Sequence, residues 1–377
     1  MEVVELNRAT SLYLDLVRPM AAMIVLFSHI SQHGLTGGQL QVFAYTGVEA
    51  VDVFFVLSGF VIAHVHATRE ADWRAFAISR AARIYSVAIP ALVLTVLVDK
   101  IGQSVDMTPY QSGFQAFTPG LLIRSLLFLG EQWNAHRFPG SDGPYWSLGF
   151  EVWYYVAFGA FVFAPGRWRW PATIGVLAFI GPKVALMFPA WLLGVASYRL
   201  CASGRIRPGL GWFLLVAPIV ALAAYEYAPH SRLQQFSELS FSADRLDRLA
   251  RDYLIAVLFS SHIVGFAAVS PRLAPWLERH ARGIRWIAGA TFSLYLAHLP
   301  IMHLLAALSP WPKSSVLTLC LLLVATPALC LLFAEFSERR KEAWRRAATA
   351  ALRAVESLLS ALRRLGERSR AAARSPR

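Results

Sequence analysis

Ionisable side chains interrupt the first apolar segment of the chain, which covers residues 12–32. Asp15, Arg18 and His29 lie within it, and His33 follows directly. A helix would bring Arg18 and His29 to within about 20° of one face, about 16 Å apart along its axis, with Asp15 and His33 within about 40° of that stripe. Charged groups are costly in hydrocarbon, so this face should be turned toward the protein interior or a wet cavity.

His29 is the strongest candidate for chemistry on this stripe, because it lies deep in an apolar run and is aligned with an arginine. An imidazole has an ordinary pKa of about 6.5, so it can be neutral near pH 7 and act as a general base. For Asp15 and Arg18, a buried polar network that holds helices together is an equally good interpretation. His33 fits the membrane interface, and we expect no catalytic role for it.

The second apolar segment, residues 47–66, contains Asp52 and Ser58. Asp52 could orient a histidine or cap a helix. The small pair at positions 58 and 59 would let another helix approach closely. Arg80 and Arg83 stand three residues apart at the start of the next apolar segment, so they share a helix face. They fit either ordinary basic anchors at the membrane surface or guanidinium forks that bind phosphates.

Two later segments also place polar groups among apolar ones. Residues 145–164 begin with Trp146 and Ser147, which suit a membrane interface, but Glu151 lies about two turns further in and needs a partner or a function. Residues 286–308 contain Tyr295 and place His298 just before a proline that favours a kink.

The composition predicts an all-α integral membrane protein of about ten spans. The 377 residues are 56% hydrophobic and 16% charged, against about 25% charged in soluble domains. Repeated apolar stretches have the length that crosses a hydrocarbon core. We expect spans at 12–32, 47–66, 83–99, 145–164, 172–181, 184–200, 210–228, 253–269, 286–308 and 314–335. Residues 172–200 fit one long helix or a hairpin turning at 181–183, and basic flanks at both ends favour the hairpin.

The net charge of +13 follows the distribution typical of membrane proteins and does not indicate nucleic-acid binding. Twelve Lys or Arg against four Glu lie in residues 338–377. Basic segments at 67–82 and 270–285 are expected in the cytoplasm with both termini, and 33–46, 100–144 and 229–252 outside. An interfacial or re-entrant piece is expected at 119–130.

The chain divides into a membrane domain at 1–335 and a basic cytoplasmic tail at 336–377. Spaced apolar side chains predict an amphipathic helix on an anionic leaflet, or one merely solvated, with the last ten residues disordered. These side chains are Trp344, Leu352, Val355, Leu359, Leu362 and Leu365. Cys201, Cys320 and Cys330 lack metal-ligand spacing, so no metal site is expected.

These motifs, taken in order over residues 12–335, resemble acyltransferase family 3, the bacterial membrane O-acyltransferases of surface polysaccharides, O-antigens and nodulation factors. The resemblance rests on LDLVR at 14–18 followed by His29, VDVFFVLSGF at 51–60, Arg80 with RIY at 83–85, YWSL at 145–148 with Glu151, and SLYL at 293–296 with His298. The chain departs from the family at Val152, where a second acid is common, and at Phe336, where the family often has proline.

The resemblance implies an acyl-CoA donor, most often acetyl-CoA, as co-substrate with no bound cofactor, and a saccharide or glycolipid acceptor. It implies a bacterial cytoplasmic membrane location. Within it, Arg18, Arg80 and Arg83 would hold the donor phosphates, His29 would be general base or transient acyl carrier, and Asp52 or Glu151 would orient its ring. Ser58, Trp146, Ser147, Tyr295, His298 and Asp15 would support the site. A transporter or flippase for a lipid-linked saccharide is the alternative that the intramembrane charges also fit.

Overall fold

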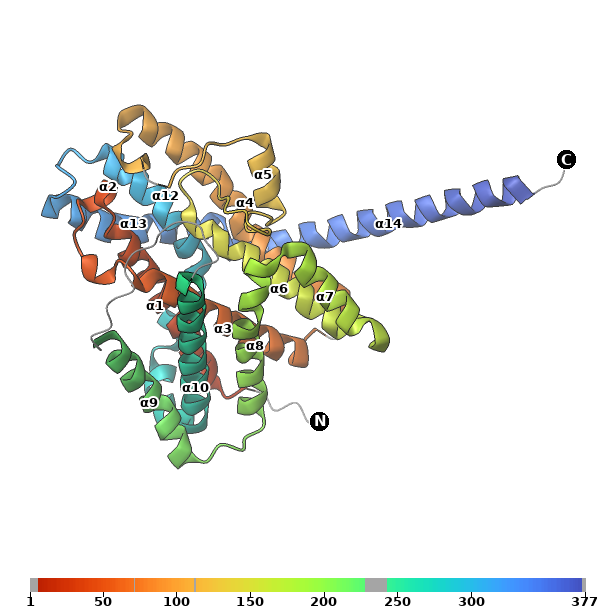
Figure 1. Cartoon of the computed structure of the whole chain (residues 1–377), viewed down its shortest axis with the longest axis horizontal. Coiled ribbons are helices and arrows are strands. Elements are labelled where there is room, and N and C mark those ends of the chain that lie inside the picture. The colour runs from red at the N-terminus through yellow and green to blue at the C-terminus, as the bar shows by residue number, and fades with distance from the viewer. Residues whose placement is uncertain (1–5, 71, 112, 228–242, 375–377) are drawn as a thin grey trace.

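Helices form nearly all of the chain in a computed structural model that describes residues 6–70, 72–111, 113–227 and 243–374. Figure 1 shows them packed as one bundle, from which the last helix projects. The helices are α1 (Arg8–Ile30), α2 (His33–Thr36), α3 (Thr46–Thr68), α4 (Trp73–Val105), α5 (Pro119–Leu126), α6 (Trp146–Phe163), α7 (Arg169–Ile180), α8 (Pro182–Ala202), α9 (Pro208–Tyr227), α10 (Ala243–Arg279), α11 (Ala281–Ala288), α12 (Thr291–Leu308), α13 (Val316–Phe336) and α14 (Lys341–Arg374).

The described residues contain nine segments long and apolar enough to cross a membrane, which confirms the all-α integral membrane class. The sequence predicts about ten spans, and the difference lies at α7. Its twelve residues measure about 18 Å, which is short of a hydrocarbon core of about 30 Å. The expected interfacial piece at 119–130 is the short helix α5.

Residues 169–202 form two helices, as the hairpin interpretation predicts. Gly181 separates α7 from α8 with φ of +100°, and a side chain there would meet the backbone of Trp133 at 2.7 Å. The Trp133 N–H donates to the carbonyl of Ile180 over 2.8 Å. The turn therefore rests against the segment between α4 and α6, residues 106–142, which we name the 106–142 loop.

Several helix ends differ from the sequence expectation. The segment predicted as one span at 286–308 breaks into α11 and α12 around Gly289 and Ala290. α4 begins ten residues before the predicted span, because Asp72 caps it by accepting from the N–H groups of residues 74 and 75. α1 ends at Ile30, so His33 belongs to α2 and does not continue the polar stripe of α1.

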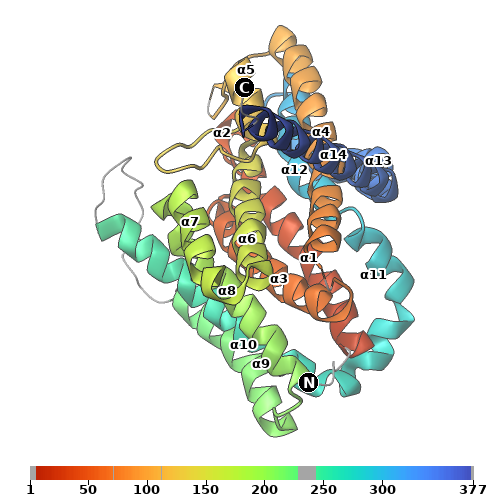
Figure 2. The same ribbon diagram turned by 90° about the vertical axis from the view of Figure 1, so that its right-hand side faces the viewer.

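The tail forms α14, which lies beside α4 and then runs free of the bundle (Figures 1 and 2). An ion pair of 2.7 Å joins Arg74 of α4 to Glu356 of α14. The helix continues to Arg374, so it includes most of the last ten residues, for which the sequence predicts disorder. The side chains of Leu359, Leu362 and Leu365 lie outside the described part of the chain, as do residues 228–242 of the expected external segment 229–252.

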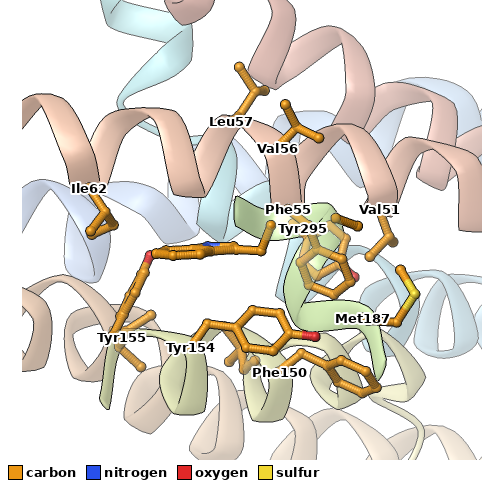
Figure 3. Close-up of a cluster of buried hydrophobic side chains, with 14 of the residues drawn as sticks. Val51, Phe55, Val56, Leu57, Ile62, Phe150, Tyr154, Tyr155, Met187 and Tyr295 are labelled. Atoms are coloured by element: carbon orange, nitrogen blue, oxygen red, sulfur yellow. The ribbon is translucent and has the colours of Figure 1, made fainter. Parts of the chain in front are cut away.

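Aromatic rings fill the centre of the bundle between α3, α6 and α8. Phe55 stacks on Phe150 and meets Tyr154 edge to face (Figure 3). Trp191 of α8 is fully buried against Tyr154 and Phe158. α12 is the most enclosed of the spans in the described residues: 78% of its residues are buried, and it packs on α1, α4 and α13. A side chain on α12 is therefore held on several sides.

Two glycines let α3 and α8 approach so closely that no side chain fits between them. A Cβ on Gly59 would lie 2.1 Å from the carbonyl oxygen of Trp191, and one on Gly194 would lie 2.0 Å from that of Val56. Since these obstacles are backbone atoms, relief would require the helices to separate.

Gly59→Ala should therefore destabilise the fold by about 1–3 kcal/mol, the usual cost of overpacking. A matched control is Gly175→Ala, because Gly175 is also helical but has no atom within 4 Å of the added Cβ. The control should leave stability unchanged or raise it slightly. Thermal midpoints of the purified variants in detergent test this, and equal midpoints for both would refute the close approach.

Candidate functional site

His29 and His298 meet inside the bundle, one from α1 and one from α12. His298 Nε2 lies 3.2 Å from His29 Nδ1, and the two rings are 5.0 Å apart between centroids. Each ring also bonds to its own helix one turn back. His29 Nδ1 lies 2.9 Å from the carbonyl oxygen of Val25, and His298 Nδ1 lies 3.0 Å from that of Leu294.

These contacts assign the protons of both rings. A carbonyl oxygen only accepts hydrogen bonds, so each Nδ1 must carry a hydrogen. His29 Nδ1–H is then shared between the Val25 carbonyl and His298 Nε2, which accepts because it is the bare nitrogen of its ring. Both imidazoles can be neutral in this arrangement. His29 Nε2 is left with a lone pair and with no hydrogen-bond partner among the described residues.

A cavity of about 500 Å³ lies beside this pair. His29 lines it, together with the end of α1, the segment up to α3, and the starts of α6 and α12. The other polar and aromatic side chains that line it are Ser28, Ser31, Gln32, His33, Gln41, Tyr45, Trp146 and Tyr295. His29 therefore lines a space that a small molecule or part of a larger one can enter.

Trp146 and Tyr295 line the same cavity, and hydrogen bonds join Tyr295 to Ser147 and Ser147 to Pro144. The Ser147 hydroxyl donates to the carbonyl of Pro144 over 3.2 Å, so Tyr295 donates its own hydroxyl to Ser147 over 2.8 Å. Trp146 packs edge to face on Phe150. This part of the predicted site is brought together around the His29 cavity.

Glu151 and Ser58 form a separate polar cluster. Ser58 donates to Glu151 over 3.0 Å, Tyr155 donates to the same carboxylate oxygen, and Trp191 Nε1 donates to Ser58 over 3.2 Å. Tyr155 lies one helical turn after Glu151, so the sequence could have shown this pair through its four-residue spacing. Glu151 is thus bonded within this cluster, whereas His29 bonds to Val25 and His298.

The three predicted donor-binding arginines have different surroundings. Arg18 pairs with Asp15 at 3.2 Å, and Arg83, Tyr155 and Glu338 lie within electrostatic range of its guanidinium. Arg80 is buried and pairs with Glu70 at 2.8 Å, a partner that the sequence analysis missed. Arg83 lies over the Phe292 ring at 4.7 Å and makes no ion pair with a described residue. Arg83 is therefore the freest of the three cations, and Arg18 and Arg80 each have one carboxylate partner.

Asp52 is brought to another acid and not to the histidines. It is 3% exposed and faces Asp252 of α10. Glu49, one turn before Asp52 on α3, pairs with Arg251 of α10. From the sequence, Asp52 was expected either to orient a histidine or to cap a helix. It lies at the contact between α3 and α10 and takes no part in the hydrogen bonds of His29.

Acidic groups are also buried where the 106–142 loop meets α4. Asp99 accepts from the backbone N–H of Ser141 at 2.9 Å and from its hydroxyl at 2.6 Å. Burial raises the pKa of Asp142 well above its usual value, and the nearby Asp99 carboxylate raises it further. The enclosed site therefore favours the protonated form of Asp142, at the base of the segment that leads into Trp146 and the cavity.

No three or more His, Cys, Asp or Glu side chains are arranged for a metal ion within the described ranges.

Glu338 is a further polar group that the sequence analysis missed. Its carboxylate accepts from the backbone N–H of Ser293 at 3.1 Å, in the first turn of α12. An acid at that position stabilises the N-terminus of the helix that carries His298.

Comparison with known proteins gives one match. A family model described as an acyltransferase domain, Acyl_transf_3, matches residues 11–335, which is most of the chain. No curated protein and no solved structure matches.

Proposed function

The chain belongs to acyltransferase family 3, and from this premise we propose that it transfers an acyl group from acyl-CoA to a hydroxyl group of a glycan or glycolipid. Acetyl is the simplest acyl group that the proposal covers. The observation that carries the proposal is the bare Nε2 of His29 in the wall of the cavity. We place the reaction in the bacterial cytoplasmic membrane.

The proposed step needs one base and no net proton release. His29 Nε2 takes the proton of the acceptor hydroxyl as its oxygen attacks the thioester carbonyl. The carbon–sulfur bond then breaks, and the protonated imidazole returns the proton to the departing thiolate. The products are an ester and CoA thiol. In a second route the same nitrogen first accepts the acyl group and then passes it to the hydroxyl.

His298 acts as a positioning residue in this proposal. When Nε2 of His29 becomes protonated, the positive charge is shared with Nδ1–H, which already points at the Val25 carbonyl and His298 Nε2. Both acceptors stabilise the imidazolium and hold the ring at one angle, as the partner of a histidine base does in other enzymes.

The donor would approach from the end of α1 that carries Arg18. Arg18 and His29 are separated by about 16 Å along a helix, a distance that the extended phosphopantetheine arm of CoA can span. Arg83 would hold a phosphate, because a guanidinium without a carboxylate partner is available to an anion, whereas Arg18 would have to share its guanidinium between a phosphate and Asp15. Arg80 would have to give up Glu70 to do the same.

The acceptor would occupy the cavity beside His29. Amide groups of Gln32 and Gln41 and the rings of Tyr45 and Trp146 line it. Hydrogen-bonding amides combined with aromatic faces suit the hydroxyl groups and apolar faces of a sugar ring. The described residues of this lining include no carboxylate and no arginine, which favours a neutral sugar at the reacting position.

The first test is transfer of label from acyl-radiolabelled acetyl-CoA to envelope saccharides extracted from cells that lack the gene. His29→Gln should lower kcat by about 10²–10⁴-fold, the usual contribution of a general base. His298→Gln should lower kcat by about 10–100-fold and leave KM for acetyl-CoA unchanged, because it acts only through His29.

His280→Gln is the matched control, because His280 is exposed near the end of α10 and should retain full activity. Wild-type transfer with an unaffected His29→Gln variant would remove the proposed base. Label bound to the protein before acceptor is added, and lost in His29→Gln, would indicate the acyl-histidine route.

The second test separates the arginines. Arg83→Gln should raise the KM for acetyl-CoA about tenfold or more and leave kcat close to wild type, because it removes a phosphate contact remote from the reacting atoms. Arg80→Gln should lower the thermal midpoint, because it leaves Glu70 buried without its partner. An unchanged KM in Arg83→Gln would contradict donor binding at this residue.

A further inference from the structure

A second cavity, separate from the one beside His29, opens on the 106–142 loop. It measures about 780 Å³ and lies between the start of α5 and two stretches of the loop, residues 114–118 and 135–137. We name it the loop groove. Among the described residues its charged side chains are Arg124 and Arg137, and none of its described lining residues is acidic.

The positive charge of the loop groove has no local counter-charge. Both arginines are exposed, and no ion pair joins either one to another residue in the described ranges; Arg124 makes one hydrogen bond of 3.4 Å, to the carbonyl of Leu129. The three acids of the loop are engaged or enclosed elsewhere. Asp106 pairs with Lys313, Glu131 with Lys183 and His136, and Asp142 is fully buried.

An apolar surface adjoins these charges on the same short helix. Ile123, Leu126 and Leu127 of the α5 region are 57%, 38% and 52% exposed. Their three- and four-residue spacing puts them on one side of α5, and Arg124 stands next to Ile123 in the sequence. Exposed leucine and isoleucine beside unpaired arginine is the pattern of a helix that lies at a membrane interface.

We propose that the loop groove binds the phosphate headgroup of an anionic membrane phospholipid, whose acyl chains lie along the apolar side of α5. The two guanidinium groups supply donors and charge for the phosphate. The exposed apolar side chains supply the contact that a water-soluble phosphate cannot use. The site is independent of the proposed acyl transfer, since it shares no lining residue with the cavity beside His29.

Lipid binding here would hold α5 and the 106–142 loop at a fixed depth in the membrane. The loop reaches α4 through Asp99 and Ser141 and then leads into Trp146 at the cavity beside His29. A bound headgroup would therefore stabilise the position of the 106–142 loop against the bundle, without contact with the reacting groups.

The test is native mass spectrometry of the full chain, released from detergent and titrated with phosphatidylglycerol or phosphatidylcholine of equal chain length. Wild type should bind phosphatidylglycerol at least tenfold more tightly. Arg124→Gln with Arg137→Gln should remove that preference and leave phosphatidylcholine binding unchanged. The control removes two exposed arginines elsewhere, Arg205→Gln with Arg207→Gln, and should keep it.

Two further arms identify the source of the phosphate and the role of the apolar side. Glycerol 3-phosphate should compete with phosphatidylglycerol only at concentrations at least a hundredfold higher than that of the lipid. Ile123→Ser should weaken binding of the lipid but not binding of glycerol 3-phosphate. Equal competition by glycerol 3-phosphate would overturn the lipid assignment. The assignment would also fail if the arginines were needed to bind trigalacturonate, an acidic saccharide, while the protein showed no preference for phosphatidylglycerol. It would fail too if the Arg205 and Arg207 control lost the phosphatidylglycerol preference to the same extent.

Discussion

The hydrogen bonds that run from the Leu294 carbonyl through His298 and His29 to the Val25 carbonyl fix the chemistry of the site. Each ring takes its own tautomer from a carbonyl four residues earlier on the same helix, which the 3.6-residue repeat places directly beneath it. The contact between the two rings then depends on the packing of α1 against α12. A shift of either helix would separate the rings before it affected the tautomers.

The packing around these helices opposes such a shift. α12 is enclosed by α1, α4 and α13, and Glu338 caps its first turn through Ser293. α3 lies between α1 and α8, and its contact with α8 is held at backbone distance by Gly59 and Gly194. Because lipid gives little hydrophobic drive for helices to associate, close backbone packing and internal hydrogen bonds must supply this rigidity.

The sequence was sufficient for the feature that depends on one helix alone. The eleven-residue interval between Arg18 and His29 gives the inward stripe of α1, because helical periodicity is a local property. The predicted place of His33 on this stripe was wrong, because α1 ends at Ile30. His33 instead begins α2, where it lines the cavity beside His29. The break between α11 and α12 was missed because both sides of it are helical and apolar enough to look continuous.

Pairings between helices could not be read from spacing. Arg80 has Glu70, Asp52 has Asp252 and Glu151 has Ser58, and each partner comes from a neighbour chosen by packing. The charge balance of residues 100–144 is a similar case. Its acids and bases balance in the sequence, but burial and pairing engage the acids and leave Arg124 and Arg137 uncompensated. A count of charged residues gives only the net charge of a segment, whereas the structure shows which charged side chains lack an ion-pair partner.

The most direct measurement of the central claim is the protonation of each nitrogen of His29, by ¹⁵N NMR of histidine-labelled protein assigned with the His29→Gln variant. The proposed role of His29 as the base predicts a neutral ring near pH 7 with hydrogen on Nδ1 and a bare Nε2, and the same tautomer at His298. Hydrogen on Nε2 of neutral His29, or an unchanged His29 signal when His298 is replaced, would contradict it.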